Sequence, residues 1–413
     1  MGLRSQKAAA PFAHLASIAQ AASDINRLTQ QYPSAPLTTT TATVTDCYSR
    51  VEATGYFSRS RSDDDVTLPP QAEFFAHFHD GAPKLQHALI ADVESATFAA
   101  LLASADDATR ARLLSGSGPG AGAWLTAIPT QQDLVMIDFS VCCAVRFRLG
   151  LPPVDSLPSK CECGAAIDPL GNHFFSCPKM KRTAITTRHD GIVRVFASVA
   201  KQAGAHVVLE PKFGSDVPDA EFAWSDGTDH VDVSVTHPAA PSYLRDGQTP
   251  QGAAAKRETV KRQRYGSFAA GMASGGGGGH FLPLVVESYG ALGQAARDYV
   301  GTLNTKLVSQ DERDHLPDQV VPIMQRLAVA LQNGNARIQK EGLLRAHGAR
   351  SGARAPRVLR RPNFQALAGL YAPSGGQAPA RATCTDTRVG PARRNVTFRT
   401  HVTDPSRLGS GAM

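Results

Sequence analysis

Long hydrophobic runs are absent from this sequence. No apolar segment of the 413 residues is long enough to span a bilayer. The first ten residues, MGLRSQKAAA, lack the apolar segment of a secretory signal peptide, and Gln6 stands where myristoylation favours Ser or Thr. We therefore expect no association with a membrane.

Cysteine is also scarce. The chain has 7 cysteines, and they are clustered along the sequence rather than spread through it. An odd, clustered set argues against a secreted scaffold held by disulfides. We therefore expect an intracellular, reducing compartment.

The positive charge is concentrated at the C-terminal end. From Arg345 onward, 12 arginines face only 2 aspartates, so this segment has a net charge of +10 while the whole chain has +7. An Arg-rich segment with abundant Pro and Gly and no apolar periodicity is predicted to be disordered and suited to binding phosphates. A compositional bias from GC-rich coding explains the same residues equally well. We assign residues 344–413 to this disordered basic tail.

Helical spacing of apolar residues dominates the N-terminal half. Residues 84–105 and 131–151 each predict an apolar helix. Residues 106–116 start with two aspartates and end with glycine, as capped helices do. These patterns predict a helical domain over residues 77–155, preceded by an N-terminal helix and a low-complexity linker over residues 1–76.

Residues 183–343 combine helical and strand patterns. A helix is expected at 188–204, a short buried strand at 205–211 and a basic helix at 253–265. In 230–235, valines alternate with Asp232 and Ser234, which is typical of a strand with one apolar and one polar face. A strand over 281–290 and two further helices complete the pattern. The order helix, strand, strand, helix, strand, helix predicts an α/β sandwich.

Three cysteines and a histidine lie within 17 residues, in the segment CECGAAIDPLGNHFFSC. Cys161, Cys163, His173 and Cys177 provide thiolate and imidazole ligands, which suit tetrahedral Zn²⁺ in a closed structural site. The Asp-Pro and Gly between them would turn the chain back toward a metal. A segment this small cannot bury a core of its own, so we expect zinc to supply the folding energy of a knuckle over residues 156–182. Three buried thiols with a chance histidine are the less favoured explanation.

Carboxylates follow the knuckle at a spacing that suits a second metal. Asp219 follows a proline at the expected start of a strand, and Asp232 lies on the polar face of the next strand. Two carboxylates on adjacent strands form an oxygen site for Mg²⁺, and Glu210 could add a third. Lys261 and Tyr265 share one face of the basic helix, where a lysine would stabilise charge on a phosphate. Surface carboxylates on a hairpin beside a solvated helix are an equally weighted alternative.

The ordered motifs resemble those of a known family. They are GSGPGAGAWLTAIPT, FRLGLP, CECG with DPLGNHFFSC, RHD, EP, PD, DVSV and KRQRY. This series, over about residues 110–290, resembles the C-terminal part of non-LTR retrotransposon polyproteins that carry a restriction-like endonuclease. In that family a CCHC knuckle directly precedes a nuclease of the PD-(D/E)XK fold. The resemblance implies a nuclear, Mg²⁺-dependent nuclease that nicks target DNA to prime reverse transcription, with DNA and possibly RNA as partners.

The resemblance also implies residue roles. Asp219 and Asp232 would be metal ligands, Lys261 the catalytic lysine and Tyr265 its helical neighbour. The four knuckle residues match Cys161, Cys163, His173 and Cys177.

Several positions depart from the family pattern. Val217 stands before Pro-Asp where the family favours a basic residue, and Ser234 stands where the wider superfamily places its lysine. Lys261 must then act from the helix, with Lys256 as a possible substitute. The palm signature of a reverse transcriptase is absent, so we expect a detached or degenerate part of such an element.

Three hypotheses follow. The first is a metal-dependent DNA endonuclease formed by residues 183–343. The second is a nucleic-acid-binding protein in which the knuckle and the basic tail bind and the nuclease fold is inert. The third is a nuclear interaction protein without a nucleic-acid role. Convergence of Asp219, Asp232 and Lys261 in space would favour the first.

Overall fold

A computed structural model provides the structure of the chain. It describes residues 10–13, 15–17, 42–52, 85–211, 218–266, 279–310 and 320–348. Most of the predicted basic tail, from residue 349 onward, lies outside the described residues, as does Val217. The last helix continues to Ala346, so the first residues assigned to the tail are helical.

The N-terminal half is helical where it is described. It contains α2 (Ala42–Glu52), α5 (Leu85–Ser104), α6 (Asp107–Ser117) and α7 (Asp138–Leu149). The predicted cap of α6 is confirmed, because the Asp106 carboxylate accepts a hydrogen bond of 2.7 Å from the amide of Thr109. The segment 131–151 does not form one continuous helix. It starts with a 3₁₀ turn, Gln132–Leu134, and the α-helix begins only at Asp138.

Mixed α/β architecture, as predicted, follows this helical part. Strands β1 (His206–Leu209), β2 (Ala220–Trp224), β3 (Gly227–Thr236) and β4 (Gly279–Glu287) form a four-stranded sheet in the order β1-β2-β3-β4. The first two pairings are antiparallel, and β3 pairs with β4 in parallel. A parallel pair needs a crossover, which contains α9 (Gly252–Arg264). The sequence pattern predicted two strands before this helix. The structure has three, because β2 lies between β1 and β3 in the sheet.

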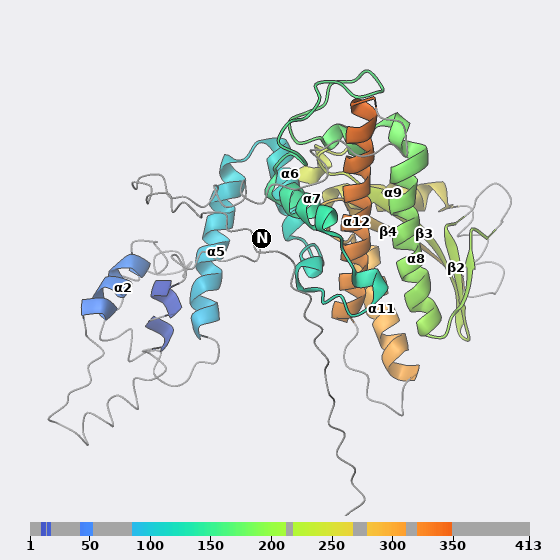
Figure 1. Cartoon of the computed structure of the whole chain (residues 1–413). Coiled ribbons are helices and arrows are strands. Elements are labelled where there is room, and N and C mark those ends of the chain that lie inside the picture. The colour runs from blue at the N-terminus through green and yellow to red at the C-terminus, as the bar shows by residue number, and fades with distance from the viewer. Residues whose placement is uncertain are drawn as a thin grey trace, which may run out of the picture. The chain divides into compact units, whose positions relative to one another are not determined.

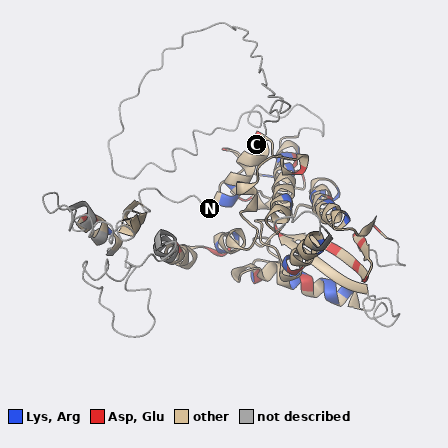
Figure 2. Ribbon diagram, turned by 90° about the horizontal axis from the view of Figure 1, so that it is seen from below, with Lys and Arg blue, Asp and Glu red and all other residues tan. Residues whose placement is uncertain are grey.

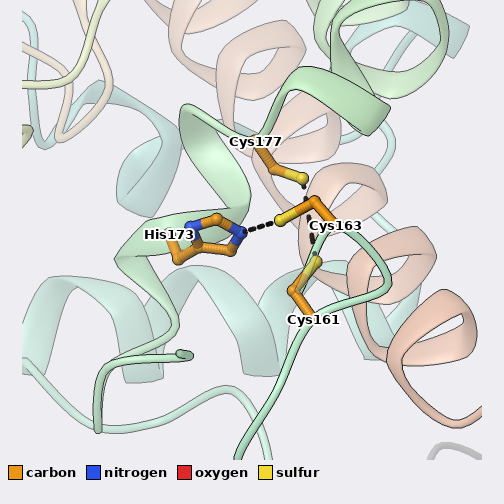
Figure 3. A group of neighbouring side chains, drawn as sticks. All are labelled: Cys161, Cys163, His173 and Cys177. Carbon is orange, nitrogen blue, oxygen red and sulfur yellow. Dashed lines mark hydrogen bonds between the residues drawn. The ribbon is translucent and has the colours of Figure 1, made fainter. Parts of the chain in front are cut away.

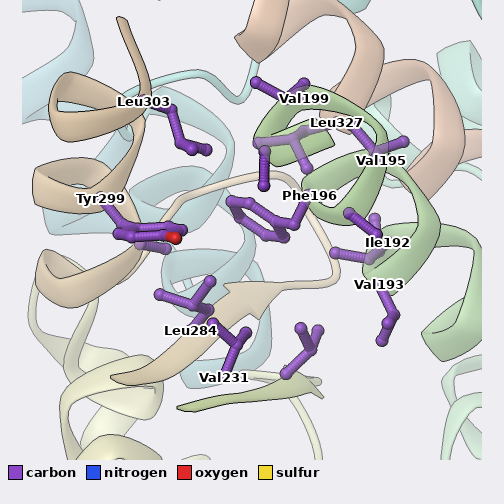
Figure 4. Packing of buried hydrophobic residues seen from close by; sticks show 14 of the residues in the cluster. Ile192, Val193, Val195, Phe196, Val199, Val231, Leu284, Tyr299, Leu303 and Leu327 are labelled. Carbon is purple, nitrogen blue, oxygen red and sulfur yellow. The ribbon is translucent and has the colours of Figure 1, made fainter. Parts of the chain in front are cut away.

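Helices cover both faces of the sheet (Figure 1). On one face, α8 (Thr186–Gln202) and α11 (Gln294–Gln310) pack on the strands, and α12 (Val320–Ala346) packs along α8. Figure 4 shows how these elements share one apolar core. Its fully buried side chains include Phe196 of α8, Val231 of β3, Leu284 of β4 and Leu303 of α11. Burial of this core holds the strands, and therefore their polar residues, in a fixed register.

The opposite face of the sheet is covered by α9. The predicted alternation of β3 is correct, because Val231 and Val233 lie in the apolar core while Asp232 and Ser234 face the other way. Asp232 is nevertheless only 3% exposed, because α9 brings Lys261 over it. Asp232 is therefore not a surface carboxylate, which removes part of the alternative explanation for this motif.

No helix in the described ranges is both long enough and apolar enough to cross a bilayer.

Candidate metal centre and candidate active site

The four predicted zinc ligands converge in space. The ligand atoms of Cys161, Cys163, His173 and Cys177 all lie within 4.8 Å of one another. Cys161 Sγ lies 3.7 Å from Cys177 Sγ, and Cys163 Sγ lies 3.2 Å from His173 Nε2. Figure 3 marks these two contacts with dashed lines. Four ligands on a tetrahedral zinc, with Zn–S near 2.3 Å, are roughly 3.5–3.8 Å apart. The group could therefore hold a metal ion such as zinc with only small side-chain adjustments.

Tight turns between the ligands produce this convergence. Gly164 has a φ of +86° and closes the first turn, in which the amide of Cys161 donates to the carbonyl of Ala165. The carboxylate of Asp168 accepts hydrogen bonds from the amides of Leu170 (3.1 Å) and His173 (2.8 Å). The Asp-Pro and Gly signals in the sequence thus mark real turns that direct the histidine toward the thiols.

The metal-ligand segment is not an independent unit, contrary to expectation. Its residues Phe174 (0% exposed), Phe175 (5%) and Met180 (1%) are buried in a cluster with residues from α7, α12 and the segment just after β4. Phe175 stacks on Phe147 of α7, with ring centroids 4.8 Å apart. The segment therefore has an apolar core, but shares it with the rest of the protein. Metal binding would supplement this packing and would not be its sole source of folding energy.

The predicted carboxylates lie at one end of the β2–β3 ladder. The antiparallel pairing of β2 with β3 aligns Ala220 with Val231. This is the last pair at that end of the ladder; Asp219 immediately precedes β2, and Asp232 follows Val231 on β3. The Asp219 carboxylate accepts a hydrogen bond from the amide of Val233, the residue next to Asp232. The spacing read from the sequence therefore brings the two aspartates close together at this end of the hairpin.

Asp219 is held by groups from two elements. Its Oδ2 accepts a hydrogen bond of 2.6 Å from the amide of Val233 and lies 3.1 Å from His189 Nε2 on α8. Burial on its own lowers the pKa of His189, but hydrogen bonds and charge from Asp219 and Asp190 outweigh it and raise the pKa to about 9. His189 is therefore an imidazolium at neutral pH, donating to Asp219. A quarter of the Asp219 side chain remains exposed, at 25%.

Asp232 is held by Lys261. The Lys261 Nζ lies 2.6 Å and 2.8 Å from the two carboxylate oxygens, and both side chains are under 10% exposed. Burial raises the pKa of Asp232, while the Lys261 charge and a hydrogen bond from Tyr265 oppose the shift. Tyr265 stacks on Phe281 of β4 at 4.6 Å, and burial together with the Asp232 charge raises its pKa to about 12. The tyrosine is therefore a neutral phenol at physiological pH.

Two other predicted residues take no part in this arrangement. Glu210 follows β1 and is exposed, with a φ of +50°, and its amide donates to the carbonyl of Asp219 at 2.9 Å. The backbone of Glu210 thus supports the site, while its carboxylate has no described contact there. Lys256 pairs with Asp246 at 2.7 Å. It is therefore engaged elsewhere and is a poor substitute for Lys261.

The motif Arg188-His189-Asp190 divides into two roles. His189 and Asp190 belong to the carboxylate site, as described above. Arg188 is 3% exposed, and its Nη1 donates to Asn335 Oδ1 of α12 at 3.0 Å. Its guanidinium also lies 5.8 Å from the centre of the Phe175 ring. Arg188 therefore joins α8 to α12 and to the metal-ligand segment. The triplet was part of the sequence resemblance, but only the structure assigns its members to separate tasks.

A buried glutamate fixes the start of the helix that carries Lys261. The N-cap residue of α9, Gln251, provides no side-chain hydrogen bond. Glu287, at the end of β4, accepts a hydrogen bond of 3.0 Å from the amide of Ala254 instead. A carboxylate at this position satisfies an orphan amide and favours the positive end of the helix dipole. No sequence pattern indicated Glu287, because its partner is remote along the chain.

Charges of opposite sign meet at this face of the sheet. Figure 2 shows Asp and Glu on the strands and Lys and Arg on neighbouring helices. Besides Lys261, α9 carries Arg262 and Arg264, which are exposed, and Arg257, whose Nε lies 3.3 Å from Ser234 Oγ. Exposed cations beside a carboxylate pair are suited to attracting a phosphate backbone.

The two candidate sites differ in the number and spacing of the donor atoms that they offer to a metal. Among the described residues, the Cys/His group is the one cluster of at least three potential ligands with closely spaced donor atoms. Asp219 and Asp232 supply two carboxylates, both of which already hold a cationic side chain. A comparison of the chain with models of known protein families, and with curated proteins, found no match. The geometry and the ordered motifs are therefore the basis for proposing a function.

Proposed function

We propose that residues 183–343 form a metal-dependent DNA endonuclease of the restriction-like type, derived from a non-LTR retroelement. The observation that carries this proposal is the meeting of Asp219, Asp232 and Lys261. Asp219 binds the amide of Val233, the residue next to Asp232, and Lys261 reaches Asp232 at 2.6 Å from a different element. Residues far apart in the sequence thus converge in the combination that phosphodiester hydrolysis requires.

The order of elements supports the proposal. The helix α8, three strands, the helix α9 and the parallel strand β4 give a mixed sheet, in which one acidic residue lies on β3 and the other immediately before β2. The PD-(D/E)XK fold implied by the motifs places its acidic residues on neighbouring strands in the same way. This order of elements is compatible with the fold that the ordered motifs imply.

Asp219 and Asp232 are the residues that would hold Mg²⁺. Bound there, Mg²⁺ would neutralise charge on the scissile phosphate and lower the pKa of a bound water. Lys261 would stabilise negative charge on the phosphate, and its ion pair keeps it directed at the site. His189, an imidazolium at neutral pH, provides a second positive charge beside Asp219 and would exchange that contact when a cation or a phosphate enters.

An inert nuclease fold is the second candidate, and a specific observation favours it. Lys261 and His189 already satisfy the carboxylates, and Asp232 is only 3% exposed. A metal has to compete with both cations. In that case the metal-ligand segment and the basic surfaces would bind nucleic acid without cutting it.

Nicking of supercoiled plasmid distinguishes these candidates. The full chain should convert supercoiled DNA to the nicked form with Mg²⁺ or Mn²⁺, and EDTA should stop the reaction. Asp219→Asn and Asp232→Asn should each lower the rate by about 10²-fold or more, because the ligands of the metal are lost. Lys261→Ala should lower the rate by a similar factor with less effect on metal affinity.

Matched variants control for charge and for folding. Asp226→Asn removes an exposed carboxylate in the same hairpin, and Lys256→Ala removes an exposed cation from the same helix. Both should retain nearly full activity. If the wild-type protein nicks no substrate with either metal, or if the Asp219 and Asp232 variants remain fully active, the endonuclease proposal is wrong. DNA binding without nicking would support the inert fold.

A further inference from the structure

Besides the carboxylate site, a polar surface lies on the side of α12 that faces α7. A groove of about 420 Å³ runs between the first turn of α7 and the C-terminal half of α12. On α12 its lining includes Arg337, Lys340 and Leu344, spaced three and four residues apart and therefore on one helical face. Asn335, which binds Arg188 of α8, points to a different side of the helix. The groove is therefore separate from the carboxylate site.

The cations of this groove are available. Arg337 and Lys340 are exposed, and neither has a carboxylate within ion-pairing distance in the described part of the chain. Arg345, at one end of the groove, is already neutralised by Glu341 at 2.8 Å and Glu162 at 3.2 Å. Two uncompensated positive charges thus face the groove, which favours an anionic ligand.

Further donors converge from α7. Ser140 is 6% exposed and lines the groove, and its hydroxyl makes no hydrogen bond to any residue that the structure describes. The first turn of α7 also lacks a side-chain cap, because Ile137 occupies the N-cap position. Uncapped amides at a helix N-terminus favour negative charge, and the exposed carboxylate of Asp138 in this turn already supplies part of it. The Ser140 hydroxyl and these amides are donors that a ligand with acceptor oxygens could use.

The floor of the groove is apolar. Ile137 is 63% exposed, and Phe139 lies beneath Lys340, whose Nζ is 5.9 Å from the ring centre. An apolar floor under a cationic rim matches a ligand that combines a flat hydrophobic group with a phosphate. The volume is suited to a group about the size of one nucleotide. A base is free to enter only when it is not paired in a duplex.

We propose that this groove binds an unpaired nucleotide of single-stranded nucleic acid, with phosphates on Arg337 and Lys340 and the base against Ile137 and Phe139. The inference extends the proposed function, because it assumes that nucleic acid is the ligand, but it does not require hydrolysis. The groove would hold a single strand on one side of the α8–α12 pair while the carboxylate site lies on the other.

Binding of a labelled oligothymidylate of about ten nucleotides tests the proposal. The measurement uses the full chain carrying Asp219→Asn, with neither Mg²⁺ nor chelator added, so that cleavage cannot interfere and any zinc bound by the Cys/His group is retained. Arg337→Gln combined with Lys340→Gln should weaken binding about tenfold and reduce the slope of log K against log salt by about 1.4, since two phosphate contacts are lost. Arg194→Gln with Lys201→Gln removes two exposed cations from α8 and serves as the control of equal net charge.

Variants of the floor test the base contact. Ile137→Ala should weaken binding roughly fivefold, because the apolar contact is reduced. Ile128→Ala, at a residue that is 70% exposed outside the groove, should have little effect. RNA and DNA oligonucleotides are compared in parallel, and a duplex of the same length should compete poorly with either strand.

Four results would overturn the inference. The first two are that the Arg337/Lys340 double variant binds the oligonucleotide as tightly as wild type, or that the α8 control loses as much affinity as the double variant. The other two are that duplex DNA, or polyglutamate of matched charge, competes as well as the single strand does. The last would show that the groove reads negative charge alone and would fit an acidic protein partner. Normal nicking with unchanged oligonucleotide binding would refute the groove and leave the endonuclease intact. If the groove variants bind more weakly but the wild-type protein never nicks DNA, the groove is supported and the endonuclease proposal is refuted.

Discussion

The ion pair between Lys261 and Asp232 permits a quantitative test of the site. The charged atoms are 2.6–2.8 Å apart, and both residues are nearly buried. At an effective dielectric constant of about 20, such a pair attracts by about 6 kcal/mol, much of which offsets the desolvation of both charges. Replacing Lys261 by Met leaves an uncompensated carboxylate in the protein interior. We expect this variant to lose about 3–5 kcal/mol of unfolding free energy.

The double variant Lys261→Met/Asp232→Asn should recover much of this loss, because no unpaired charge remains buried. Urea unfolding at pH 7, followed by circular dichroism, provides the four free energies of the cycle. A coupling energy of about 2 kcal/mol or more is expected. Additive single variants, with a coupling below about 0.5 kcal/mol, would refute the proposed geometry of the pair.

The pH dependence of the single variant provides an internal check. Burial raises the pKa of Asp232, and Lys261 opposes that shift. Without Lys261 the folded-state pKa should therefore rise further above the unfolded value. A group with a raised pKa favours the folded state most at low pH, and this contribution is lost as the pH rises through the folded-state pKa. The destabilisation of Lys261→Met relative to wild type should therefore be smaller at pH 4 than at pH 7. An equal difference at both pH values would contradict a buried, unpaired carboxylate.

Two further predictions concern the metal-ligand segment and its packing. Protein purified without chelator should contain about one zinc per chain by elemental analysis. Cys161→Ser should abolish zinc binding, while Cys142→Ser, outside the cluster, should not. A fully folded wild-type protein without metal would refute the zinc assignment. In α12, Gly342→Ala would place a Cβ 2.5 Å from the Phe174 ring and should cost about 1–3 kcal/mol of unfolding free energy. Gly301→Ala in α11 meets no atom within 4 Å and should instead stabilise the protein by up to about 1 kcal/mol, so thermal unfolding of the two variants should shift in opposite directions.

Local patterns in the sequence determined several of the helices, strands and turns of this protein. The helical period of residues 253–265 and the alternation of residues 230–235 predicted α9 and β3, because these periods reflect which side chains face the core. The turn residues between the metal ligands predicted the convergence of the Cys/His group, because their effect is confined to a few neighbouring residues. The spacing of Asp219 and Asp232 suited adjacent strands, since a hairpin fixes register through its turn.

Only the tertiary structure decided which of these residues act together. It placed His189 rather than the carboxylate of Glu210 beside Asp219, and it engaged Lys256 elsewhere while directing Lys261 to Asp232. It also joined the metal-ligand segment to α7, α12 and the segment just after β4 in one core. These contacts connect elements remote along the chain, so no local period or spacing encodes them. They depend on how α8, α9 and α12 pack on the sheet, which is set by the apolar surface that the whole chain buries together.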